Sequence, residues 1–217
     1  MPLIAKNKGG GNFEPVPEDQ HIGRCVLIVD IGTQESSYGD KHQCIIGWEL
    51  PQVLQVFDEA KGEEPSMLSK FFTISLNEKA NLRQALESWR GKAFSDAELE
   101  GFDLEALAAA PCLLQVIHKT APNGDVRAQI NSVSKLPKGL ACPPQVTPTR
   151  VFTLDAGTQE DFEGLPEWIQ DQVKACSEYG AWCQRVGGAP VKAPVTGPAV
   201  TELTFGSDGP PADEVPF

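Results

Sequence analysis

Residues 70–94 read KFFTISLNEKANLRQALESWRGKAF and combine the two periodicities that decide the fold of this chain. The first part alternates between apolar and polar residues, as a half-buried β-strand does. The later apolar residues recur at helical spacing, and Gly91 is a natural stop. The stretch therefore predicts a strand over residues 70–76 that leads directly into a helix. Ser75 and Glu78 have capping-box spacing, and Asn77 is a rival N-cap.

The same region reverses the charge of the chain. The formal net charge is −12, yet residues 70–93 hold five bases against two acids, and residues 106–150 hold five against one. An acidic chain is not expected to bind nucleic acid or membranes indiscriminately, but its net charge does not exclude a basic groove. Two interpretations stay open: chance variation on a solvated surface, or a cationic binding surface with acidic flanks.

Two strands are predicted before this region. Residues 21–32 are apolar on both faces, which is typical of a central strand, and residues 41–50 form the returning strand. Pro51 is expected to end that strand, and residues 51–69 to form a mobile loop. Gly47 inside the strand indicates a bulge or a close backbone approach.

A helix and two more strands are predicted after it. Residues 95–110 read as a helix with a second capping box, and residues 111–120 and 126–135 alternate as strands. Asn123-Gly124 between these strands is a strong hairpin signal. The resulting order is that of a five-stranded OB-fold barrel with a helix between strands 3 and 4. Other small α+β domains share such an order and remain alternatives.

The two ends of the chain differ from its middle. Residues 1–17 are rich in Gly and Pro and are expected to be a flexible arm. The predicted domain spans residues 18–186 and includes an extra C-terminal amphipathic helix over residues 165–185, which should pack against the barrel. Residues 187–217 are expected to be a disordered acidic tail.

The six cysteines include no C-x-x-C pair, so buried, reduced thiols are expected. A zinc site made by Cys176, Cys183 and a distant His is an alternative with unusual spacing, and no metal or cofactor is otherwise expected. Residues 1–12 lack the apolar core of a signal peptide, and no apolar run is long enough to span a bilayer.

Two stretches resemble known proteins. VDIGTQ and IIGWEL within residues 29–50, the run FTISLNEKANLRQALESWRGKAF and PCLLQVIHK are similar to a family of bacteriophage single-stranded DNA-binding proteins, over about residues 18–136. Residues 213–217, DEVPF, resemble the C-terminal tip of bacterial single-stranded DNA-binding proteins. The resemblance implies a non-catalytic OB-fold protein that coats and protects single-stranded DNA during phage replication and recombination. It also implies a location in the cytoplasm of the infected bacterium and recruitment of replication or recombination proteins by the tip.

A protein that binds single strands needs cations along a groove and aromatic faces for the bases. The candidate DNA-binding residues are Tyr38, Lys41, Trp48, Lys70, Phe71, Lys79, Arg90, Lys92, Lys119, Arg127 and Lys135. Phe71 should face outward because Phe72 faces the core, whereas Trp48 shares the parity of apolar neighbours and could equally be a core residue. Arg83 could instead pair with Glu87 on its own helix.

The candidate partner-binding residues form the tip. They are Asp213, Glu214, Val215, Pro216 and Phe217, and they combine carboxylates with an aromatic ring. A partner with an apolar pocket ringed by Arg or Lys could hold both.

Two other classes of function are alternatives to DNA binding. One is an acidic protein-interaction module, or DNA mimic, without affinity for single strands. The other is an enzyme such as a nuclease or deaminase. The sequence contains no H-x-E with P-C-x-x-C, no Ser/His/Asp set and no phosphate loop, so no enzymatic activity is expected.

Overall fold

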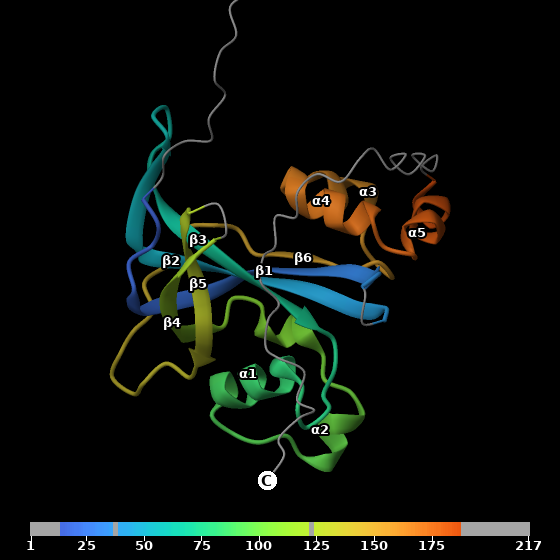
Figure 1. The fold of residues 1–217 in the computed structure, drawn as a ribbon, viewed down its shortest axis with the longest axis horizontal. Helices are drawn as coiled ribbons and strands as arrows, with labels where there is room; N and C mark the ends of the chain where they lie inside the picture. Colours follow the sequence, from blue (N-terminus) through green and yellow to red (C-terminus); the bar gives the residue numbers. More distant parts are fainter. Residues whose placement is uncertain (1–13, 37–38, 122–123, 188–217) are drawn as a thin grey trace, which may run out of the picture.

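The computed structural model describes residues 14–36, 39–121 and 124–187. Five long strands form a curled antiparallel sheet in the order β3-β2-β1-β4-β5 (Figure 1). The strands are β1 (Asp19–Gln34), β2 (Lys41–Asp58), β3 (Gly62–Thr73), β4 (Pro111–Thr120) and β5 (Val126–Ser134), and a short β6 (Arg150–Phe152) pairs in parallel with β1. The predicted hairpin is therefore confirmed, whereas β6 lies in a stretch without a predicted strand.

The two ends of this sheet approach each other through β3 and β5. The Nζ atom of Lys70 on β3 donates hydrogen bonds to the carbonyl oxygens of Ile130 (3.1 Å) and Asn131 (3.2 Å) on β5. Helix α1 (Asn81–Arg90) follows β3 and precedes β4. The expected fold, a mostly-β, five-stranded OB-like barrel with a helix between strands 3 and 4, is therefore confirmed.

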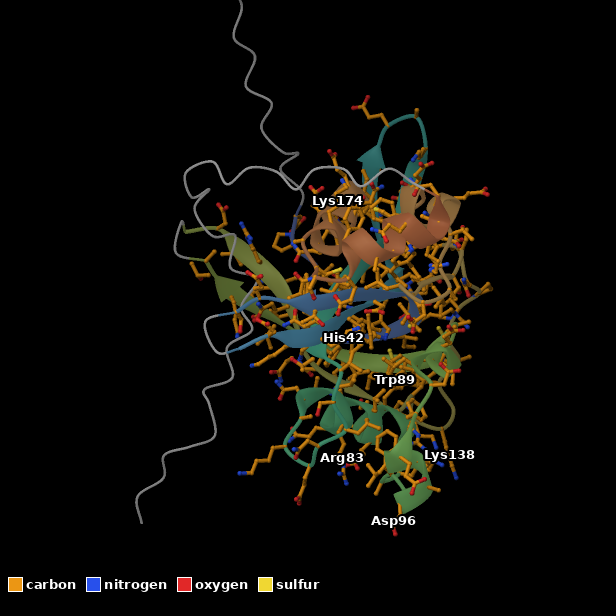
Figure 2. The ribbon with its side chains drawn as sticks, turned by 90° about the vertical axis from the view of Figure 1, so that its right-hand side faces the viewer. His42, Arg83, Trp89, Asp96, Lys138 and Lys174 are labelled. Carbon is orange, nitrogen blue, oxygen red and sulfur yellow. The ribbon has the colours of Figure 1, made fainter. Side chains whose placement is uncertain are left out.

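Helices cover the sheet on two sides. Figure 2 shows Lys174 of α4 (Glu167–Lys174) on one side of the sheet and Trp89 of α1 on the other. Strand β1 lies between these layers and has buried side chains on both of its faces, as expected for a central strand. It therefore contributes to two separate cores.

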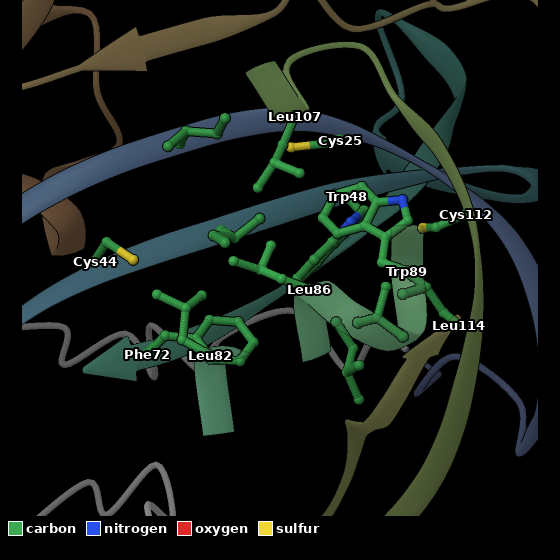
Figure 3. Close-up of a cluster of buried hydrophobic side chains, with 14 of the residues drawn as sticks. Cys25, Cys44, Trp48, Phe72, Leu82, Leu86, Trp89, Leu107, Cys112 and Leu114 are labelled. Atoms are coloured by element: carbon green, nitrogen blue, oxygen red, sulfur yellow. The ribbon is translucent and has the colours of Figure 1, made fainter. Parts of the chain in front are cut away.

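The first core fills the barrel beneath α1 (Figure 3). Leu82, Leu86 and Trp89 of α1 are buried there, and the Trp89 ring lies 5.7 Å from that of Trp48 on β2. The indole N–H of Trp89 donates to the Pro111 carbonyl (2.9 Å), which ties the helix to β4. Gly91 ends the helix with φ of 68°, the left-handed conformation that its sequence position predicts.

The start of α1 differs from the prediction. Strand β3 ends at Thr73, and α1 begins after Ala80, which makes no side-chain capping bond. Neither the capping box of Ser75 and Glu78 nor the Asn77 cap forms. Instead Asn77 begins a turn, because its carbonyl accepts from the N–H of Ala80 (2.9 Å). That turn reorients the chain between the strand and the helix.

The prediction of a loop over residues 51–69 is wrong. Strands β2 and β3 extend through most of this range as a long hairpin arm, with Leu54 paired to Pro65. Figure 1 shows this arm projecting beyond the rest of the sheet. Pro51 does not end β2, because it lies in an irregularity of the pairing between Leu50 and Leu54, where the ladder requires no donor.

The close backbone approach predicted at Gly47 is confirmed. A side chain at this position would place Cβ only 3.0 Å from Cβ of Leu27 on the neighbouring strand β1. The pairing of the two strands shifts register at this point, between Cys25 and Leu27. A bulge in β1 and a glycine in β2 therefore curve the barrel wall together.

Both long predicted helices are divided. The Ser95–Glu98 capping box forms, but α2 (Asp96–Glu100) stops before Gly101, and a short 3-10 helix η1 (Leu104–Leu107) follows. The C-terminal helix separates into α4 and α5 (Tyr179–Val186), preceded by the unpredicted α3 (Gln159–Glu163). Gly101 has an extended backbone with ψ of 128°, which no helix can continue through.

These C-terminal helices form the second core. Ile169 and Val173 of α4 and Trp182 of α5 pack against Val29 and Ile31 of β1. The expected packing of the C-terminal helix against the barrel is confirmed. Residues 14–17, assigned to the flexible arm, also contact the barrel, since the Val16 carbonyl lies 2.8 Å from Nε2 of His118. Residues 1–13 and 188–217, which include most of the predicted arm and tail, lie outside the described residues.

The contact between β1 and the α4–α5 connection gives a stability prediction. Gly32 has φ of +69°, and a Cβ there would lie 2.6 Å from Sγ of Cys176. We expect Gly32→Ala to lower the free energy of unfolding by about 3 kcal/mol, combining left-handed strain with a steric clash. Chemical denaturation of the full chain measures this change in the free energy of unfolding.

Gly62 provides the matched control. It has φ of +79° at the tip of the hairpin arm, and a Cβ added there would have nothing within 4 Å. Gly62→Ala should therefore cost only the backbone strain, about 1 kcal/mol. Equal losses in the two variants would contradict tight packing of Cys176 against β1.

Candidate nucleic-acid interface

The predicted cations separate into groups at opposite ends of the β4–β5 hairpin. Lys119 and Arg127 are paired directly across its closed end. Lys135 follows its open end, where its backbone N–H donates to the Ser88 carbonyl of α1 (3.1 Å). Lys41, at the start of β2, and Lys79, before α1, are exposed. The predicted cations therefore do not all lie on one binding surface.

Lys70 lies where β3 meets β5. Its ammonium is half-buried and bound to two β5 carbonyls, so it joins the strands of the barrel. Burial, together with the charge of Lys119, lowers the pKa of Lys70. Lys70 and Lys119 are therefore close enough for their charges to repel each other. Lys70 thus adds to the positive charge at the closed end of the β4–β5 hairpin. Arg127 adds to this field and lies 3.8 Å from the Asp125 carboxylate.

Arg90 has a structural role instead of the predicted DNA contact. Its side chain is only 13% exposed and pairs with Glu98. Its guanidinium lies 4.4 Å from the ring centre of Phe94 and 4.9 Å from that of Phe102. These contacts hold α2 against the end of α1, and they leave little of the guanidinium for a phosphate.

Lys92 shares the same carboxylate. Its Nζ atom lies 3.1 Å from Oε1 of Glu98, although its side chain is 62% exposed. Arg83 pairs with Glu87 at 3.0 Å, which confirms the intrahelical alternative. Three of the bases that make residues 70–93 locally positive are therefore partly neutralised by nearby acids.

The buried position of Trp48 excludes it from stacking on a base. Its side chain has no exposed surface and packs in the first core against Trp89. The prediction of Trp48 as a DNA-binding residue is wrong, and the core alternative is confirmed. Its parity with Cys44, Ile46 and Leu50 decides the matter, because all of these face the barrel interior.

Phe71 faces away from the first core, as predicted, while Phe72 is buried in it. Phe71 is half-buried because Trp168 of α4 lies beside it, with ring centres 6.2 Å apart. Trp168 is 43% exposed, as is Phe57 on the hairpin arm, and the sequence interpretation missed both as surface aromatics. Ile169, adjacent to Trp168, is fully buried, and two neighbouring helical residues of this kind rarely share one face, which is the signal that could have identified Trp168.

Two sets of candidate residues lie around β3, on opposite faces of that strand, because adjacent residues of a strand point to opposite faces. The cationic set comprises Lys119 and Arg127 of the β4–β5 hairpin and Lys70, whose Nζ atom lies 5.7 Å from the centre of the buried Phe72 ring. The aromatic set is Phe71 with Trp168 of α4. We call these five residues the strand surface. Tyr38 and the tip residues 213–217 lie outside the described residues.

The described histidines are bound to protein groups. Nε2 of His42 lies 2.6 Å from the Asp30 carboxylate, and Nε2 of His118 contacts the Val16 carbonyl. Within the described ranges, no three His, Cys, Asp or Glu side chains are grouped so that they could hold a metal, so the zinc alternative at Cys176 and Cys183 has no site.

The cysteines in the described ranges are free thiols, as predicted. Burial raises the pKa of both Cys25 and Cys44 to about 12, which keeps these thiols protonated. Within the described ranges, no helix combines the length and the apolar character of a membrane span.

Comparison with known proteins gives no relative. No protein-family model, no curated protein and no solved structure matches the chain. The resemblance to phage single-stranded DNA-binding proteins therefore stays a prediction.

The Glu98 network gives a titration prediction. The Ser95 backbone N–H and then the Lys92 ammonium bond to the carboxylate, and they help lower its pKa to about 2. Lys92→Ala should raise this pKa, and Lys61→Ala on the distant hairpin arm should leave it unchanged. The side-chain carboxyl shift of Glu98, followed by NMR during acid titration, measures both.

The sign of the linked stability follows from the direction of the shift. The pKa of Glu98 in the folded protein lies below the ordinary value of 4.5. The stabilisation from its ionised carboxylate is therefore present above about pH 4.5 and is lost as the pH falls toward 2. A wild-type midpoint near 4.5 would show that Glu98 does not bind these partners.

Proposed function

We propose that this protein binds single-stranded DNA without sequence preference through the strand surface. The observation that carries the proposal is the pair of opposed cations on an OB-like barrel, with a partly exposed aromatic pair on the other face of β3. Lys119 and Arg127 face each other across the hairpin, and Phe71 and Trp168 lie 6.2 Å apart beside β3. The net charge of −12 makes a surface of this kind unusual within the chain.

The cations suit the phosphate of a nucleotide, and the aromatic rings suit its base. Lysine and arginine neutralise phosphates, whereas an exposed indole stacks on any base because every base has a π-face. The acidic surroundings repel polyanions that do not reach the cations. The proposed binding is therefore sequence-tolerant and weakens as salt is added.

The biological role that we propose follows the resemblance. The protein coats and protects single strands during phage replication and recombination in the cytoplasm of the infected bacterium. It has no catalytic role, and residues 213–217 recruit replication or recombination proteins.

The opposed cations give the first test. Lys119→Ala/Arg127→Ala should weaken binding of oligo-dT about tenfold, which corresponds to about 1.4 kcal/mol. The slope of log affinity against log salt should fall in magnitude by about 1.4, or about 0.7 for each lost phosphate contact. Fluorescence anisotropy of the full chain at several salt concentrations measures both.

Lys61→Ala/Lys92→Ala is the matched control. It removes two positive charges from exposed lysines outside the strand surface. This variant should keep its affinity within about twofold and its salt slope within about 0.7. An equal loss in both double variants would refute a localised site, and salt-independent binding would argue against phosphate contacts altogether.

Trp168 gives a second, spectroscopic test. The side chains of Trp48, Trp89 and Trp182 are 0%, 5% and 3% exposed, whereas that of Trp168 is 43% exposed. Base stacking should therefore quench the fluorescence of Trp168 alone, and Trp168→Phe should abolish the quenching by oligo-dT. Its affinity should change less than that of Trp168→Ala, which should lose about 1–3 kcal/mol. Quenching that persists in Trp168→Phe would place the contact elsewhere.

One observation favours the protein-interaction module as a second candidate. Leu54, Val56 and Met67 on the hairpin arm are each at least 44% exposed, and acidic residues flank them. Exposed apolar side chains on a projecting element commonly mark a protein contact. This candidate predicts no DNA affinity even after residues 187–217 are removed, and oligo-dT binding by a 1–186 truncation would exclude it.

A further inference from the structure

A groove of about 650 Å³ lies between the end of α1, the η1 region and residues 135–140. Its apolar lining includes Trp89, Phe102 and Leu107 on one side and Leu136 and Leu140 on the other. Leu140 is 50% exposed, so this lining is open to solvent. The groove can therefore accept an apolar side chain without displacing core residues.

Four cations surround this apolar lining. They are Arg90, Lys92, Lys135 and Lys138. Lys135 and Lys138 form no ion pair with any residue in the described part of the chain. Glu98 compensates only Arg90 and Lys92. The groove therefore has unbalanced positive charge beside an apolar floor.

Arg90 adds a second sign of an incomplete site. Its Nη1 atom is buried and has no hydrogen-bond partner within the described structure. A buried guanidinium donor without an acceptor is costly, and a carboxylate is the acceptor that fits it best. Because this atom is itself closed to solvent, it adds to the positive charge beside the groove and is not a direct contact for a docked carboxylate.

We propose that this groove holds residues 213–217 of the same chain. The segment DEVPF supplies two carboxylates followed by Val, Pro and Phe, so its charge and its apolar end both complement the groove. Phe217 fits the apolar lining, while Asp213 and Glu214 complement Lys135 and Lys138. The inference concerns the tip of the proposed function but does not depend on DNA binding.

The chain between the domain and the tip is long enough. Residues 188–212 connect Gly187 to Asp213, and about 25 residues can extend up to about 80–90 Å. A domain of this size has a diameter of about 40 Å, so the tip can reach the groove from any point on the surface. Because the connection is covalent, the effective concentration of the tip favours docking within one molecule.

Docking in this groove leaves the strand surface open. The groove adjoins the open end of the β4–β5 hairpin, where Leu113 pairs with Ser134, whereas Lys119 and Arg127 lie at the closed end. Figure 2 shows Lys138 on the α1 side of the sheet, away from Lys174 on α4. Tip docking and DNA binding should therefore occur together instead of competing.

Photo-cross-linking tests the location. We would replace Phe217 of the full chain with benzoylphenylalanine, irradiate at low micromolar concentration and map the products by mass spectrometry. The expected products join position 217 to residues 102–107 or 136–140 of the same molecule. Cross-links to the strand surface, cross-links mainly between molecules, or their absence would overturn the proposal.

Charge reversal tests the chemistry in the same assay. Lys135→Glu/Lys138→Glu should reduce groove cross-links at least fivefold, and adding Asp213→Lys/Glu214→Lys should restore them to at least half. Lys61→Glu/Lys119→Glu is the matched control and should not reduce them. Loss without rescue, or an equal loss in the control, would overturn the proposal.

Anisotropy with oligo-dT keeps the two proposals separate. Lys135→Glu/Lys138→Glu should leave DNA affinity within about threefold, allowing for the change in net charge. A variant that loses cross-links and keeps DNA affinity supports the groove as a docking site. If the wild-type chain fails to bind DNA but still cross-links in the groove, the proposed function fails and this inference stands.

Discussion

The burial of β1 on both faces is the constraint on which the rest of the structure depends. Ile28 faces the barrel core, whereas Val29 and Ile31 face the core beneath α4 and α5. A strand of this kind cannot present a face to solvent, so the C-terminal helices are part of the fold and not an appendage. Their position also closes the outer face of β1 around Val29 and Ile31, together with Ile45 of β2, to any ligand. The exposed β surface that remains lies around β3 and the β4–β5 hairpin.

The basic residues of the chain differ in whether an acidic side chain pairs with them. Arg90, Lys92 and Arg83 are near one another in sequence, but acidic partners hold each of them. Lys119 has no such carboxylate partner among the described residues, and its charge adds to the burial that lowers the pKa of Lys70. Several bases of the locally positive segment therefore stabilise the fold through ion pairs. A local excess of bases does not by itself indicate a binding site. The cations best placed to meet a ligand lie at the two ends of the β4–β5 hairpin.

The sequence predicted the elements that depend on local chemistry. A local turn signal predicted the β4–β5 hairpin, and the left-handed Gly91 and the Ser95 capping box each depend on residues close by in the sequence. Tertiary contacts decided the rest. Pro51 is tolerated because the pairing of β2 is irregular beside it, and the hairpin arm extends where a loop was expected. Ion pairs such as Arg90 with Glu98 join separate helices, so no helical period reveals them. The contact of Phe71 with Trp168 likewise depends on how α4 packs, whereas the burial of Trp48 follows from its strand parity.

Hydrogen–deuterium exchange with and without oligo-dT tests the central claim most directly, because it locates bound DNA on the intact chain without a substitution. We expect slower exchange in residues 66–73 of β3, in residues 117–130 around the β4–β5 hairpin and at the start of α4, with little change at residues 135–140. Protection confined to residues 135–140, or none at a saturating concentration of oligo-dT, would contradict it.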